Sequence, residues 1–88
     1  MEIEVMIQNK LGLHLRAAAV LIKLANTFKC EITISKENQS ANGKSIMGIM
    51  ALAASPGTKL KVFCEGADEA EACNKIKKLV DDKFGEKE

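Results

Sequence analysis

The stretch LKVFCE at residues 60–65 decides the fold class. Its apolar residues Leu60, Val62 and Cys64 stand at every second position, and the charged residues Lys61 and Glu65 flank the central three. This period of two is typical of a β-strand that buries one face. Residues 1–7 and 30–35 show the same alternation. Since each of these strands has a single apolar face, we expect a mostly antiparallel sheet that helices cover on one side.

Two helices are predicted between these strands. An alanine-rich stretch from Arg16 onwards predicts a helix of about three turns. Its apolar residues follow helical spacing: Leu21, Leu24, Ala25 and Phe28. A second, shorter helix over residues 46–54 is apolar nearly all round, with Ser45 suited to cap its start and Pro56-Gly57 suited to end it.

The last helix is predicted from one apolar stripe: Cys73, Ile76, Val80 and Phe84. Asp68 suits its N-cap with Glu71 as the partner in a capping box, and Gly85 ends it. Residues 36–42 are polar and predict at most a short strand before a turn. The expected order is β-α-β-β-α-β-α in an α+β fold, as one domain over residues 1–88.

Composition excludes several classes of protein. A net charge of +1 and a lack of Trp and Tyr argue against a nucleic-acid binder. The longest mostly apolar run, residues 46–54, is too short to span a membrane, and the acidic start is unlike a signal peptide, so we expect a cytoplasmic protein. Cys30, Cys64 and Cys73 are widely spaced, which predicts buried free thiols and no metal site.

His14 stands where a glycine-containing loop meets the first predicted helix. Helix N-termini present free backbone N–H groups and a partial positive charge, which suit a phosphate. Arg16 adds a permanent cation, and imidazole can form a covalent phosphoryl intermediate. Residues 12–16 therefore suit the acceptance and release of a phosphoryl group, although the same pattern also fits an exposed loop histidine beside a surface arginine.

Ser45 allows two interpretations. A serine N-cap needs no further role, but a phosphate on Ser45 would place its charge at a helix N-terminus, where it is tolerated. The apolar residues that follow cannot all face one core on so short a helix, so some should be exposed as a docking surface. Charge added on Ser45 would weaken docking there. The candidates for its centre are Leu15, Ile46, Met47 and Met50.

Across nearly the whole chain, these segments resemble the HPr family of phosphocarrier proteins. The active loop of that family reads Gly, Leu or Ile, His, a small residue, Arg, Pro, Ala, and residues 12–18 read GLHLRAA. The regulatory motif appears as NGKSIMGIM at residues 42–50, and residues 66–86 also look like the family. Two departures are Ala17 in place of Pro and Leu15 in place of a small residue.

The resemblance implies an open-faced sandwich with strand order first, fourth, second, third, and three helices on one face. It implies that phosphoenolpyruvate phosphorylates enzyme I on a histidine and that enzyme I transfers the phosphoryl group to Nδ1 of His14. His14 would then pass it to a histidine of an enzyme IIA. Arg16 and the backbone N–H of Ala17 would help to hold that group. The chain would be a monomeric carrier without cofactor, and not an enzyme.

Three functions remain open at the level of the sequence. The first is a phosphocarrier for sugar uptake or for a regulatory branch. The second is a mainly regulatory paralogue, in which an HPr kinase/phosphorylase modifies Ser45 and so sets binding to a transcriptional regulator. The third is an unrelated α/β module that binds RNA or a small ligand, which the neutral charge and scarce aromatic residues disfavour.

Overall fold

The alternating segments form four strands, and the helical segments form three helices and a final 3₁₀ turn. The computed structural model describes all of residues 1–88. Its elements are β1 (Glu2–Met6), α1 (Leu15–Ala25), β2 (Glu31–Lys36), β3 (Gln39–Asn42), α2 (Ile46–Ala51), β4 (Lys59–Glu65), α3 (Glu69–Asp81) and η1 (Lys83–Gly85). This confirms the predicted order. None of the helices combines the length and apolar character that a membrane crossing requires.

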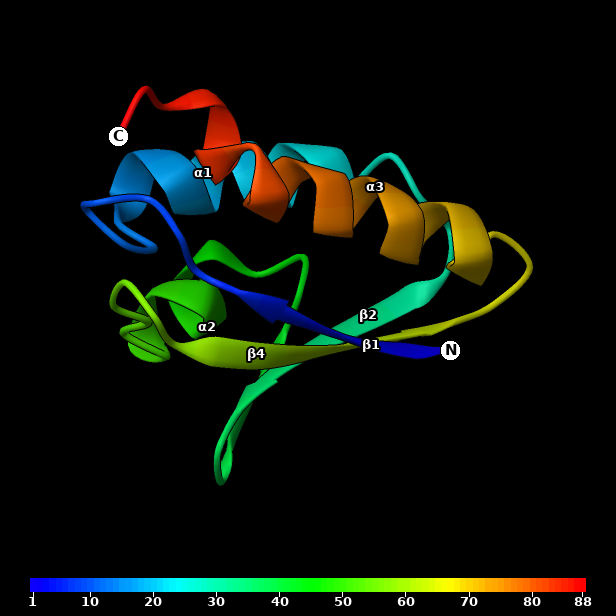
Figure 1. Cartoon of the computed structure of the whole chain (residues 1–88). Helices are drawn as coiled ribbons and strands as arrows, with labels where there is room; N and C mark the ends of the chain where they lie inside the picture. Colours follow the sequence, from blue (N-terminus) through cyan, green and yellow to red (C-terminus); the bar gives the residue numbers. More distant parts are fainter.

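The strands form one antiparallel sheet in the order β1-β4-β2-β3, which confirms the arrangement implied by the resemblance. In the centre, Val62 of β4 lies opposite Ile3 of β1 and Ile34 of β2. Leu60, Val62 and Cys64 are buried, whereas the residues between them are exposed. The helices lie over the buried face, and the other face is open (Figure 1). The fold is therefore an open-faced sandwich.

The three cysteines lie in the core as free thiols, as predicted. Cys30 follows α1 and its loop, Cys64 lies on β4 and Cys73 on α3. Burial is the largest cause that raises the pKa of the Cys64 thiol, to about 12. At neutral pH this thiol is therefore protonated and behaves as a small apolar side chain.

All three helices end earlier than the apolar spacing predicts. α1 ends at Ala25, although Phe28 is buried beyond it. α2 ends at Ala51, before the Pro-Gly pair expected to stop it. α3 ends at Asp81, and Phe84 is buried from within η1 with a φ of 56°. In each case the chain leaves the helix, but the next apolar side chain is still buried in the core. Apolar residues that follow helical spacing in the sequence can therefore be buried without being part of the helix.

The capping box predicted for α3 is wrong. Asp68 is the N-cap residue, but its side chain makes no cap hydrogen bond. Its two carboxylate oxygens instead accept the backbone N–H groups of Lys29, at 2.8 Å, and Cys30, at 2.9 Å. Glu71 pairs with Lys75 one turn along the helix. Asp68 therefore links the start of α3 to the loop between α1 and β2.

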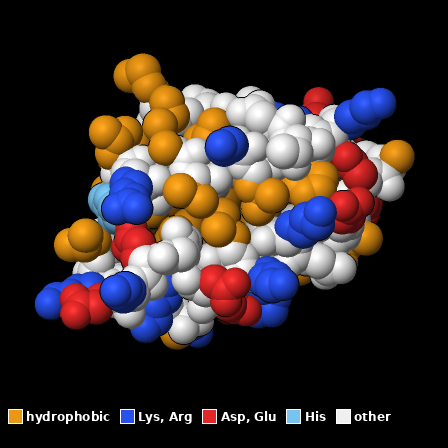
Figure 2. Space-filling model, turned by 90° about the horizontal axis from the view of Figure 1, so that it is seen from above, with side chains coloured by type: hydrophobic (Ala, Val, Ile, Leu, Met, Phe, Trp, Pro, Cys, Tyr) orange, Lys and Arg blue, Asp and Glu red, His pale blue; other side chains and the backbone are white.

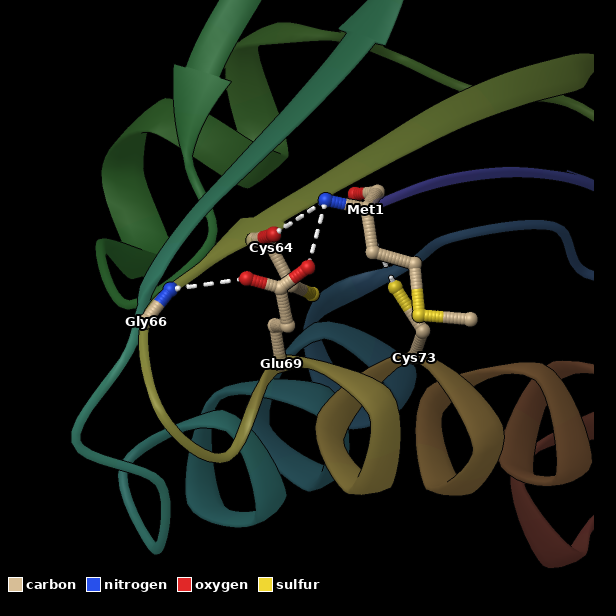
Figure 3. Close-up of polar contacts among 5 residues, drawn as sticks. All are labelled: Met1, Cys64, Gly66, Glu69 and Cys73. Carbon is tan, nitrogen blue, oxygen red and sulfur yellow. Dashed lines mark hydrogen bonds and ion pairs between the residues drawn. The ribbon is translucent and has the colours of Figure 1, made fainter.

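Glu69 joins the first strand to the last helix (Figure 3). One carboxylate oxygen accepts the N–H of Gly66 at 3.3 Å, and the other lies 3.0 Å from the ammonium group of Met1. That ammonium group also donates to the carbonyl oxygen of Cys64 at 2.8 Å. The hydrogen bond with Met1 is the largest cause that lowers the pKa of Glu69.

We predict that Asp68→Asn lowers the stability of the fold at neutral pH, because an amide has only one acceptor oxygen and its NH2 group would face the second backbone N–H. The N–H of Lys29 is the largest cause that lowers the pKa of Asp68. The carboxylate therefore contributes stability above the pKa it has in the unfolded chain, and that contribution is lost as the pH falls through the lower pKa of the folded state.

Urea unfolding of the Asp68→Asn variant should show a lower midpoint than wild type at pH 7 and a smaller difference at pH 3. Glu71→Gln is the matched control, because an exposed pair of this kind contributes only about 0.3–0.5 kcal/mol. Equal midpoints for the two variants at pH 7 would contradict the assignment of Asp68 as a link between α1, β2 and α3.

Candidate functional site

His14 is the N-cap residue of α1, at the end of a loop that is anchored on both sides. Gly12 turns the loop with a φ of +69°, a conformation that favours glycine. Its neighbour Leu13 is buried and donates its backbone N–H to the carbonyl oxygen of Ala54 at 2.8 Å. The side chain of His14 is therefore held at the rim of the fold, 27% exposed.

The N-terminus of α1 has free hydrogen-bond donors. The first bond of the helix joins the N–H of Ala18 to the carbonyl oxygen of His14, at 2.8 Å. The N–H groups of Leu15, Arg16 and Ala17 have no acceptor, and the His14 side chain does not cap them. These donors and the positive end of the helix dipole favour an anion at this position.

The structure places Arg16 and His14 along the same open hollow of about 620 Å³, together with Lys10 and residues 85–88. Arg16 is exposed, so its guanidinium is free to meet a ligand. Ala17 is fully buried, and its backbone N–H lies in the first turn of α1. No three His, Cys, Asp or Glu side chains come together as metal ligands. The hollow therefore brings an imidazole and a guanidinium together with the ammonium groups of two lysines and the carboxylates of two glutamates.

Two residues that the sequence analysis did not single out complete the surroundings of His14. Glu86 forms a hydrogen bond with Nε2 of His14 through one carboxylate oxygen, and the other accepts Nδ2 of Asn9 at 2.8 Å. The Asn9 bond is the largest cause that lowers the pKa of Glu86, with smaller contributions from His14 and Arg16. No local pattern marks Glu86, because its contacts come from the other end of the chain.

Ser45 is the N-cap of α2, as predicted. Its Oγ accepts the backbone N–H of Gly48 at 3.2 Å. The apolar residues after it divide as expected, because Ile49 is fully buried whereas Met47 is 81% exposed. Ile46 and Met50 are each 36% exposed.

Several apolar side chains close to His14 in the sequence are exposed. Leu15, next to His14, is 62% exposed, and Leu11 and Val20 are exposed as well. The one histidine of the chain, pale blue in Figure 2, has hydrophobic groups on both sides and a cationic group beside it. The four residues predicted to dock are thus exposed, and Leu11 and Val20 are two further exposed apolar side chains that the sequence did not single out.

We predict that Gly12→Ala destabilises the protein more than Gly57→Ala does. Both glycines have positive φ, so an alanine costs about 1–2 kcal/mol at either position. A Cβ on Gly12 would also lie 2.7 Å from the carbonyl oxygen of Ala54, whereas one on Gly57 would meet nothing within 4 Å. Urea unfolding measures both losses, and equal losses would contradict the tight anchoring of the loop.

Comparisons with known proteins cover most of the chain. The family described as the PTS HPr component phosphorylation site matches residues 1–82. The phosphocarrier protein HPr of Neisseria meningitidis serogroup A is 48% identical over 80 residues, which cover 91% of this chain and 90% of that protein. The HPr-like protein Crh of Bacillus subtilis is 40% identical over 73 residues, which cover 83% of this chain and 86% of Crh.

Solved structures give the same result. The crystal structure of HPr-C-His from Thermoanaerobacter tengcongensis matches with a TM-score of 0.96 and 43% sequence identity. The match covers 100% of this chain and 99% of the chain in that structure. The crystal structure of HPr from Bacillus anthracis matches with a TM-score of 0.88 and 38% sequence identity. That match covers 91% of this chain and 95% of the chain in that structure. The family match and these relatives show that the chain belongs to the HPr family of phosphocarrier proteins of the phosphotransferase system.

Proposed function

We propose that this chain accepts a phosphoryl group on His14 from phosphorylated enzyme I, with phosphoenolpyruvate as the original donor, and passes it to an enzyme IIA. The observation that carries the proposal is the position of His14 at a helix N-terminus with free N–H groups. An imidazole placed there can attack phosphorus while the helix and Arg16 bind the phosphoryl oxygens. The family membership agrees with this role.

Nδ1 is the nitrogen of His14 that we propose as the acceptor. Nε2 is engaged by Glu86, so Nδ1 is the ring nitrogen that remains free to attack. The backbone N–H groups of Arg16 and Ala17 and the guanidinium of Arg16 would bind the phosphoryl oxygens. Transfer then depends on positioning and charge stabilisation, without a metal or cofactor of the carrier itself.

The open position of His14 suits a carrier, since each partner must reach the phosphoryl group directly. The exposed side chains of Leu15, Ile46, Met47 and Met50 would form the apolar centre of the interface with enzyme I and enzyme IIA. Leu15, in place of a small residue, enlarges this apolar rim. A carrier must also leave each partner quickly, which a small interface of this kind allows.

Incubation with enzyme I and phosphoenolpyruvate labelled in its phosphate tests the proposal. We expect one label per chain, lost in acid and stable in base as for phosphohistidine, and no label on a His14→Ala variant. Circular dichroism of the variant confirms that it is folded. A wild-type chain without label, or a folded His14→Ala variant with an equal label, would refute the proposal.

Ser45 supports a regulatory role in addition to transfer. Its hydroxyl lies at the N-terminus of α2, directly before the exposed Ile46 and Met47. A phosphate at this position would be tolerated by the helix and would place charge at the proposed docking surface. We propose Ser45 as the substrate of an HPr kinase/phosphorylase, with a transcriptional regulator as a further partner. The alternative to a phosphocarrier is a mainly regulatory paralogue, whose chief role is this control through Ser45.

We predict that Ser45→Asp slows the phosphorylation of His14 by enzyme I about tenfold or more, because a charge beside an apolar interface must be desolvated on docking. Ser45→Asn is the matched control, since Asn and Asp are both good N-caps but Asn is neutral. The rates of labelling measure the effect. Equal rates for the Asp and Asn variants would contradict a docking surface at Ser45.

A further inference from the structure

The chain after α3 is shaped to bring Glu86 to His14. Lys83, Phe84 and Gly85 all have positive φ, which turns the backbone sharply. Phe84 is buried and anchors this turn in the core. The last residues then lie at the N-terminal end of α1, as the red end of the ribbon shows in Figure 1. The carboxylate of Glu86 consequently reaches His14 from a position that is fixed by packing.

Asn9 holds the other side of this carboxylate. Asn9 is fully buried, and its Nδ2 donates to the carbonyl oxygen of Gly12 at 2.7 Å and to Glu86 at 2.8 Å. Both partners are acceptors, so only one orientation of the amide satisfies them. This orientation leaves Oδ1 of Asn9 buried without a hydrogen-bond partner. A buried oxygen without a partner destabilises the fold, and the protein retains it at the residue that positions Glu86.

The contact between Glu86 and His14 is partly shielded from water. The side chain of Glu86 is 15% exposed and that of His14 is 27% exposed. Bonds from Asn9 and His14 lower the pKa of Glu86, so it is ionised at neutral pH. The other charged groups of the hollow are Lys10, Arg16, Lys87 and Glu88, and Lys10 pairs with Glu88 at 3.6 Å. Glu86 is the carboxylate bound to the ring.

We propose that Glu86 is the positioning residue of the phosphoryl acceptor, with Asn9 as its support. The carboxylate accepts the Nε2–H of His14, fixes the orientation of the ring and leaves the lone pair on Nδ1. The inference rests on the proposed function and adds to it the group that prepares the histidine for attack.

The charge balance of the reaction gives Glu86 a second effect. When the Nδ1 lone pair forms the bond to phosphorus, the bond from phosphorus to the donor's imidazole nitrogen breaks and leaves its electron pair on that nitrogen. Nε2 of His14 keeps its proton, so the ring becomes cationic, and the ionised Glu86 stabilises that cation. When the phosphoryl group leaves, the electron pair returns to Nδ1 and the ring is neutral again.

The test compares Glu86→Ala with Glu88→Ala, which removes a carboxylate from the same segment without a contact to His14. In ¹H–¹⁵N NMR spectra, we expect the Nε2–H signal of His14 to be observed in wild type and in Glu88→Ala, and to be lost to exchange with water in Glu86→Ala. Labelling by enzyme I should slow about tenfold in Glu86→Ala and change less than about twofold in Glu88→Ala. Thermal unfolding of both variants checks the fold.

The outcomes separate this inference from the proposed function. A wild-type chain that takes up no label refutes the function itself, and the NMR comparison then decides alone whether Glu86 holds the ring. A labelled wild type together with equal rates for the two variants overturns the role of Glu86. An unchanged Nε2–H signal in Glu86→Ala overturns it as well.

Discussion

The structure depends on the burial of one face of β4. This strand pairs with β1 on one side and β2 on the other, and its inward residues are all but inaccessible to water. A short chain has only α1, α2 and α3 with which to cover that face, so the other face of the sheet is open. The helix ends therefore come to the rim of the sandwich, where their free backbone groups meet solvent. His14 lies at one of these helix ends, on the rim of the sandwich.

Three segments from distant parts of the chain meet at one point of the rim. The loop at Gly12 is fastened to Ala54, which follows α2, and Glu86 arrives from the turn after α3. Each of these segments is anchored by a residue in the core, namely Leu13, Leu52 and Phe84. The same burial that stabilises the fold thus positions the groups around His14. In the proposed transfer, a partner protein would need to add only the donor or the acceptor of the phosphoryl group.

Interactions between near neighbours in the sequence could be predicted, whereas those between distant residues could not. The alternation of residues 60–65 predicts β4, and the serine before an apolar run predicts the cap of α2. Asp68 resembles a local cap in the sequence, but its carboxylate binds backbone groups 38 and 39 residues away. Glu86 and His14 are separated by 72 residues, so no spacing rule connects them. The family motif identifies His14 and Arg16, but only the fold brings Glu86 to them.

The N-termini of α1 and α2 differ in a way that separates their roles. Ser45 satisfies one of the free N–H groups of α2 with its own side chain, as a good N-cap does. His14 is a poor N-cap, because its ring is turned to Glu86 and the N–H groups of α1 stay open. Asn9 is a second exception, because its buried side-chain oxygen has no hydrogen-bond partner although buried polar atoms are normally paired. Departures from local stability rules tend to gather where a protein binds or reacts, and here one is His14 itself and the other is Asn9, which is linked to it through Glu86.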